Sequence, residues 1–257
     1  MKHFDHKLGD YLQLDGANIY YEVTGYDNGP VLLLLHGGFG NLEYFNPIIP
    51  HLKREFKIVG IDSRGQGKST RGTAKLSYEQ LQRDVERVVE HLKLERFSIV
   101  GFSDGGIVGS RLAAFTSLPI EKLVTIGSRW HVKNTEPNRN LFLSITPDGW
   151  KQKFPGTYHS YQKLNPEPDF DSLVPALVQM WLDPTPSGSP NETVKNISCP
   201  LLIVRGDQDF ILSLEMAVEL SQLVKGSTVL NIPFAGHSTL EDQLELFMLG
   251  LNEFLAD

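Results

Sequence analysis

The chain has 257 residues, of which 40% are hydrophobic and 21% are charged, a composition that excludes a disordered or low-complexity protein. The 31 acidic residues outnumber the 24 Lys and Arg residues, and the formal charge of −7 argues against nucleic acid or an anionic membrane as the main partner. Cys199 is the single cysteine, which excludes an intramolecular disulfide framework. The chain shows no apolar run long enough for a membrane span and no secretory signal at its start, so we expect a cytoplasmic protein.

Short apolar runs recur along the chain and predict strands. The first two, residues 11–14 and 18–24, flank Asp15-Gly16, a pair typical of a hairpin turn. Residues 31–35 are continuously apolar, as in a strand buried on both faces. Five later runs repeat this mainly apolar character: residues 56–61, 97–101, 123–126, 201–204 and 229–232.

Helical patterns separate these predicted strands. Ser77 and Gln80 form a capping-box pattern, followed by apolar residues spaced three and four apart. Further helices are expected over residues 103–115, 212–223 and 239–255. This alternation predicts an α/β fold whose mostly parallel central sheet carries helices on both faces.

One long segment, residues 128–196, contains no buried-strand pattern and holds all three tryptophans. It is too long for a plain loop, so we expect a mainly helical cap, or lid, inserted into a core of residues 1–127 and 197–257. Most aromatic residues of the cap should pack it against the core. Where the cap covers the strand ends some should line a pocket, with Trp130, Trp150 and Trp181 as candidate substrate contacts.

The candidate nucleophile is Ser103, within Gly101-Phe102-Ser103-Asp104-Gly105. This Gly-x-Ser-x-Gly pattern lies between a predicted buried strand and a predicted helix, where a sharp turn exposes the serine hydroxyl above the sheet. The alternative is a serine that serves only as the N-cap of the helix.

A serine hydroxyl needs a base, and His237 is the candidate among eight histidines because it follows the last predicted strand. His36 ends a buried strand and is expected to be structural, whereas His3 and His6 are expected to be mobile. The carboxylate that orients His237 is expected to be Asp209, which has room to turn back toward the histidine loop. Asp207 is the alternative, although its place beside a turn glycine suits a turn cap.

The oxyanion of an acyl-transfer intermediate needs backbone N–H donors. We expect these from Gly38, or alternatively Phe39, and from the backbone of Asp104. The glycine spacing after His36 does not fit a dinucleotide-binding loop, and no His and Cys spacing suits zinc, so neither cofactor nor metal is expected.

These motifs together resemble the α/β-hydrolase family with a cap domain, over residues 10–127 and 197–257. The matching motifs are His36-Gly37-Gly38, the turn Asp62-Ser63-Arg64-Gly65-Gln66-Gly67-Lys68-Ser69, Ser103, Gly206-Asp207-Gln208-Asp209 and Ala235-Gly236-His237. Residues 101–106 are similar to the biphenyl-hydrolase-like, valacyclovirase-type serine esterases. Phe39-Gly40 departs from the Pro-Gly of peptidase-type members, and the serine departs from the aspartate of epoxide hydrolases and haloalkane dehalogenases.

The sequence and this resemblance predict a metal-free serine hydrolase acting on a small carboxylic ester through an acyl-enzyme. An α-amino acid ester is one candidate, with the side chain of Asp104 facing the substrate ammonium and Phe39 also contacting the substrate. The alternatives are an amide, thioester, lactone or carbon–carbon bond cleaved by the same residues, or a ligand receptor with vestigial activity. The natural substrate and the oligomeric state are left open.

Overall fold

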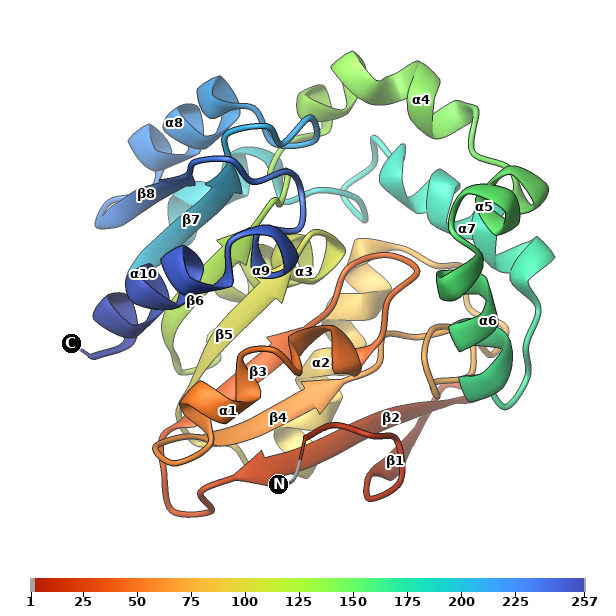
Figure 1. Ribbon diagram of the computed structural model, residues 1–257, viewed down its shortest axis with the longest axis horizontal. Helices are drawn as coiled ribbons and strands as arrows, with labels where there is room; N and C mark the ends of the chain where they lie inside the picture. Colours follow the sequence, from red (N-terminus) through yellow and green to blue (C-terminus); the bar gives the residue numbers. More distant parts are fainter. Residues whose placement is uncertain (1–2, 257) are drawn as a thin grey trace.

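The computed structural model describes residues 3–256 and is built around one eight-stranded sheet (Figure 1). In spatial order the strands are β1 (Asp10–Leu14), β2 (Ala17–Gly25), β4 (Lys57–Ile61), β3 (Val31–Leu35), β5 (Phe97–Phe102), β6 (Ile120–Ile126), β7 (Leu201–Gly206) and β8 (Ser227–Ile232). From β4 to β8 neighbouring strands pair in parallel, whereas β2 pairs antiparallel with β1 and with β4. The expected mostly parallel sheet is therefore confirmed.

The first two strands form the expected hairpin. Leu14 pairs with Ala17, which leaves Asp15 and Gly16 as a two-residue turn. Both have positive φ, 48° and 76°, the conformation that favours an Asp-Gly pair in such turns.

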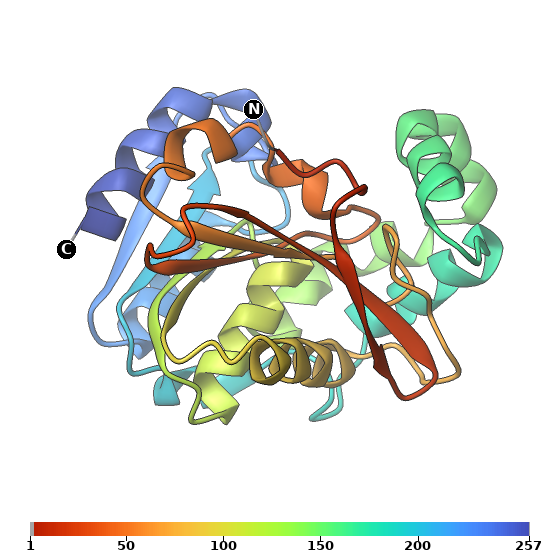
Figure 2. The same ribbon diagram turned by 90° about the horizontal axis from the view of Figure 1, so that it is seen from below.

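Helices cover both faces of the sheet (Figure 2). One face packs against α2 (Tyr78–His91), α3 (Asp104–Phe115) and α8 (Leu214–Leu223). The other packs against η1 (Leu42–Phe45), α1 (Ile49–Leu52), α9 (Thr239–Asp242) and α10 (Leu244–Ala256). The central strands are apolar throughout because each of their faces meets one of these two helical layers.

The predicted helices begin close to their expected positions. Ser77 caps α2 by accepting a hydrogen bond from the Gln80 amide at 3.0 Å, while the Gln80 side chain donates to Asp84 rather than closing the capping box. The single helix expected over residues 239–255 is instead two, α9 and α10, because Gln243 leaves helical geometry at φ −144° and ψ 58°.

The segment between β6 and β7, for which we keep the name cap as a label, is helical, and its middle part lies beyond the carboxyl ends of the parallel strands (Figure 1). Its last helical turn packs instead against α3 and α8. Its elements are η2 (Val132–Asn138), α4 (Arg139–Leu143), α5 (Pro147–Lys153), α6 (Pro155–Leu164), α7 (Phe170–Trp181) and η3 (Asn191–Asn196). Within residues 3–256, no helix has the length and apolar character needed to cross a membrane.

Candidate active site

Ser103 occupies a strained turn between β5 and α3. Its φ of 50° and ψ of −115° are unfavourable for a residue with a side chain. Small neighbours are required there, since a Cβ on Gly101 would lie 2.4 Å from the Gly105 carbonyl oxygen and one on Gly105 2.0 Å from that of Leu35. Ser103 makes no side-chain cap hydrogen bond to α3, which disfavours a role as an ordinary N-cap.

Three side chains from separate loops meet in front of this turn. The His237 Nε2 atom lies 3.1 Å from Ser103 Oγ, and His237 Nδ1 lies 3.1 Å from each carboxylate oxygen of Asp209. A carboxylate can only accept, so Nδ1 carries the proton and Nε2 is left to accept from the serine hydroxyl. The structure thus brings together Ser103, His237 and Asp209.

The Asp209 carboxylate is fixed in position by its own loop. It is 5% exposed, and Oδ1 accepts hydrogen bonds from the amides of Ile211 at 2.8 Å and Leu212 at 3.2 Å. Asp207, the alternative, accepts instead from the Ala235 amide at 3.2 Å. Asp207 therefore fixes the loop that carries His237, while Asp209 contacts the ring.

Gly127, which was not predicted as a site residue from the sequence, lies against the contact between His237 and Asp209. It follows β6 with a φ of 59°, and a Cβ there would be 2.8 Å from His237 Nδ1 and 3.0 Å from Asp209 Oδ2. The only sequence signal is a glycine directly after a buried strand, which also fits many ordinary turns.

The loop after β3 faces the serine with free backbone donors. Gly38, Phe39 and Asp104 all line one pocket, and their amide N–H groups donate to no other residue within the described part of the chain. His36 anchors the loop, because its Nδ1 donates to the Gly37 carbonyl at 2.7 Å and its Nε2 accepts from the Ser63 amide at 2.9 Å. Burial lowers the pKa of His36, so the ring is neutral and structural, as expected.

The pocket has a volume of about 520 Å³ and a largely aromatic wall. Phe39 from the loop packs on two cap rings, with centroids 4.0 Å away for Trp150 and 5.6 Å away for Trp181. Phe154 continues the wall, 4.6 Å from Trp150. The expected pocket positions of Phe39, Trp150 and Trp181 agree with this arrangement.

Trp130 does not belong to this pocket, which corrects the expectation that it contacts substrate. Its side chain is 1% exposed and its Nε1 donates to the Met216 carbonyl at 2.9 Å. This indole fills the core beneath the cap because the β6–cap junction turns it toward α8.

The Asp104 carboxylate is buried and both of its oxygens are engaged. Oδ1 accepts from the Tyr78 hydroxyl at 2.7 Å, and Oδ2 accepts from the Trp181 indole N–H at 2.9 Å. Burial raises the pKa of Asp104, while these two donors and the nearby Arg129 oppose that rise. The side chain thereby joins α2, the serine turn and the cap helix α7.

Comparison with known proteins places this geometry in a family. The family model of the alpha/beta hydrolase fold matches residues 30–185. The chain belongs to the α/β-hydrolase fold family. Other α/β-hydrolases with similar sequences include human serine hydrolase BPHL, 26% identical over 88% of this chain and 78% of that protein. The uncharacterized hydrolase YugF of Bacillus subtilis is 22% identical over 95% of both chains.

Solved α/β-hydrolases share the same architecture. The enol-lactonase from Burkholderia xenovorans LB400 superposes with a TM-score of 0.76 at 21% identity, covering 96% of this chain and all of that one. A hydrolase from Pseudomonas aeruginosa superposes with a TM-score of 0.78 at 20% identity over 98% of this chain and all of that one. At such low identity the likeness establishes the fold alone. Within residues 3–256 of this α/β-hydrolase, no cluster of three or more His, Cys, Asp or Glu side chains could hold a metal ion.

Proposed function

We propose that this α/β-hydrolase is a serine hydrolase that cleaves a small carboxylic ester through an acyl-enzyme intermediate. The observation that carries the proposal is the Ser103 hydroxyl, held on a strained turn 3.1 Å from the unprotonated nitrogen of His237. The opposite nitrogen of that ring contacts Asp209. This order of contacts lets the imidazole take a proton from serine and lets Asp209 stabilise the resulting imidazolium.

The reaction follows from these contacts. Ser103 Oγ attacks the ester carbonyl as its proton moves to His237 Nε2, and the carbonyl oxygen becomes an oxyanion. The amide of Asp104, with that of Gly38 or Phe39, stabilises this oxygen. His237 then gives the proton to the departing alcohol. A water molecule activated by His237 attacks the acyl-enzyme, and Ser103 recovers its proton when the acid leaves.

The pocket favours an ester with an apolar or aromatic acyl group. Its wall contains Phe39, Trp150, Phe154 and Trp181, and such surfaces gain about 25 cal/mol for each Å² of apolar substrate that they cover. The Asp104 carboxylate already accepts from Tyr78 and Trp181. It therefore offers poor recognition of a substrate ammonium, and we infer a neutral ester rather than an α-amino acid ester.

Turnover of p-nitrophenyl esters by wild type and Ser103→Ala tests this function. We expect hydrolysis by wild type and a loss of more than about 10⁴-fold in kcat for the variant. Turnover of an amide, a thioester and a lactone, compared with turnover of the esters, tests the other bonds that the same residues could cleave. Binding of esters without turnover would contradict the hydrolase and favour a receptor.

A matched pair of esters tests the inferred neutral substrate. One carries a free α-amine and the other carries the N-acetylated amine, and we expect wild type to show no preference for the free amine. A preference for the free amine that disappears in Asp104→Asn would restore the ammonium-binding role of Asp104.

A further inference from the structure

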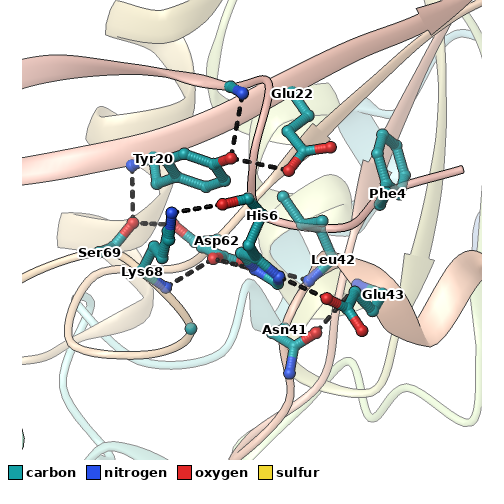
Figure 3. A network of polar contacts seen from close by, with 12 residues as sticks. Phe4, His6, Tyr20, Glu22, Asn41, Leu42, Glu43, Asp62, Lys68 and Ser69 are labelled. Carbon is teal, nitrogen blue, oxygen red and sulfur yellow. Dashed lines mark hydrogen bonds and ion pairs between the residues drawn. The ribbon is translucent and has the colours of Figure 1, made fainter. Parts of the chain in front are cut away.

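Phe4 and His6, close to the start of the described residues, are packed against the fold, which corrects the expectation that His6 is mobile (Figure 3). The Phe4 side chain is fully buried. Its amide donates to Asn46 Oδ1 at 3.0 Å, and its carbonyl accepts from Asn46 Nδ2 at 2.9 Å. His6 is 3% exposed and has a φ of 57°, a left-handed conformation that persists only where its surroundings fix it.

The His6 ring lies between two carboxylates (Figure 3). Its Nδ1 is 2.7 Å from Glu43 Oε1 and its Nε2 is 2.8 Å from Asp62 Oδ2. Carboxylate oxygens accept and do not donate, so both contacts are hydrogen bonds only when both ring nitrogens carry protons. The arrangement therefore suits an imidazolium, whose positive charge also compensates the fully buried Asp62.

Asp62 connects this ring to the loop that carries the proposed oxyanion donors. Its Oδ1 accepts from the Leu42 amide at 2.8 Å, at the end of that loop, and its Oδ2 accepts from the Lys68 amide at 2.7 Å. The next residue, Ser63, donates its amide to the His36 ring at the start of the loop. Residues 62–63 thus hold both ends of the segment 36–42.

The other ionisable groups around His6 act in different directions, and the nearby Lys68 ammonium disfavours an imidazolium. The Tyr20 ring of β2 stacks on it at 5.4 Å, and the Tyr20 hydroxyl donates to Glu22 at 2.7 Å. The Lys68 ammonium donates to the His6 carbonyl oxygen. Burial raises the pKa of Tyr20 and lowers that of His36, so both stay uncharged across the neutral range.

We propose that His6, as an imidazolium between Asp62 and Glu43, is a positioning residue that fixes the loop carrying the oxyanion donors. The proposal rests on the proposed hydrolase function of that loop. When His6 loses one proton, a ring nitrogen presents a lone pair to a carboxylate. The buried Asp62 also loses its charged partner, so segment 36–42 loses part of its support.

The stabilisation that His6 gives to segment 36–42 should depend on pH in a definite direction. Burial alone would lower the pKa of His6, but hydrogen bonds and attraction from Asp62 and Glu43 outweigh it and raise the pKa above its ordinary value of 6.5. The stabilisation is therefore complete below pH 6.5 and is lost as the pH rises through the raised pKa of the folded state.

The test compares kcat and KM across about pH 6 to 10 for wild type, His6→Gln and Glu43→Gln, with the exposed His51→Gln as the matched histidine control. NMR follows the His6 ring protons, assigned through their contacts with the stacked Tyr20 ring. Indole fluorescence reports the loop independently of turnover, since Phe39 contacts Trp150 and Trp181.

We expect wild type and His51→Gln to lose kcat by roughly tenfold at alkaline pH with little change in KM. Complete loss of an oxyanion donor costs about 10²–10³, and a loop that is loosened but still present should cost less. The fluorescence step and the His6 titration should share that midpoint. Glu43→Gln should move all three midpoints down by about one pH unit. His6→Gln should show low kcat without the alkaline step.

Wild-type kcat and an unchanged alkaline step in His6→Gln would overturn the proposal. The proposal would also be overturned if Glu43→Gln shifted the midpoint of the His6 titration but left the midpoints of kcat and of fluorescence unchanged. This comparison is the deciding one if His6→Gln does not fold. If wild type hydrolyses no ester, the proposed function fails. The His6 and fluorescence midpoints then still test the coupling: coincident midpoints support it and separate midpoints contradict it.

Discussion

At the scale of single residues, the proposed chemistry depends on which aspartate contacts His237. Asp209 contacts the ring at 3.1 Å, whereas Asp207 accepts from the backbone of the histidine loop. We expect Asp209→Asn to lower kcat by roughly 10³–10⁴-fold, because the amide favours the histidine tautomer that cannot accept the serine proton. Asp207→Asn keeps an oxygen for the Ala235 amide and should change kcat by only a few-fold.

The measurement is kcat on p-nitrophenyl acetate, with thermal unfolding of both variants as the control for an intact fold. A larger loss in Asp207→Asn than in Asp209→Asn, at equal stability, would transfer the orienting role to Asp207.

The sequence predicted some of these residues and not others for a physical reason. Ser103 and Asp209 each follow a buried apolar strand, and His237 follows the partly exposed edge strand β8. Parallel strands bring their carboxyl ends to one edge of the sheet, which brings these residues together. His6 and Trp130 lack such a local signal, and the signal of Gly127, a glycine after a buried strand, also fits many ordinary turns. The close approach of Gly127 to His237, the burial of His6 and the bond from Trp130 to Met216 all depend on segments distant in sequence.

At the scale of elements, the cap is attached to the serine turn through one buried carboxylate. Trp181 on α7 donates to Asp104 at 2.9 Å and packs on Phe39. We expect Trp181→Phe to destabilise the fold by about 1–3 kcal/mol, because one Asp104 oxygen loses its donor. It should also alter KM for bulky aromatic esters more than for acetates, since the pocket wall changes there.

Trp130→Phe is the matched control for that prediction. This substitution also removes a buried indole donor, but the lost hydrogen bond is the one to the Met216 carbonyl, which lies away from the pocket. Thermal unfolding should show a comparable loss for both variants, while the preference among esters changes only in Trp181→Phe. An equal change of preference in Trp130→Phe would contradict the assignment of Trp181 to the pocket wall.

The strands could be predicted more fully than the cap. Strands β3, β5 and β7 are buried along both faces, so their apolar runs mark them without ambiguity. The cap helices are short and the Phe154 turn joins two of them, so the sequence predicts a helical insertion but not its helix boundaries. The break between α9 and α10 falls at Gln243, which is neither Gly nor Pro, so no residue that typically ends a helix marks it in the sequence.

At the scale of the whole molecule, the sheet, the two helical layers and the cap place Ser103, the proposed nucleophile, in the wall of an aromatic pocket. The most direct test is the intact mass of the protein after treatment with a fluorophosphonate, followed by peptide mapping. We expect a single adduct on Ser103 in wild type and none in Ser103→Ala. An adduct at another residue, or equal labelling of Ser103→Ala, would contradict it.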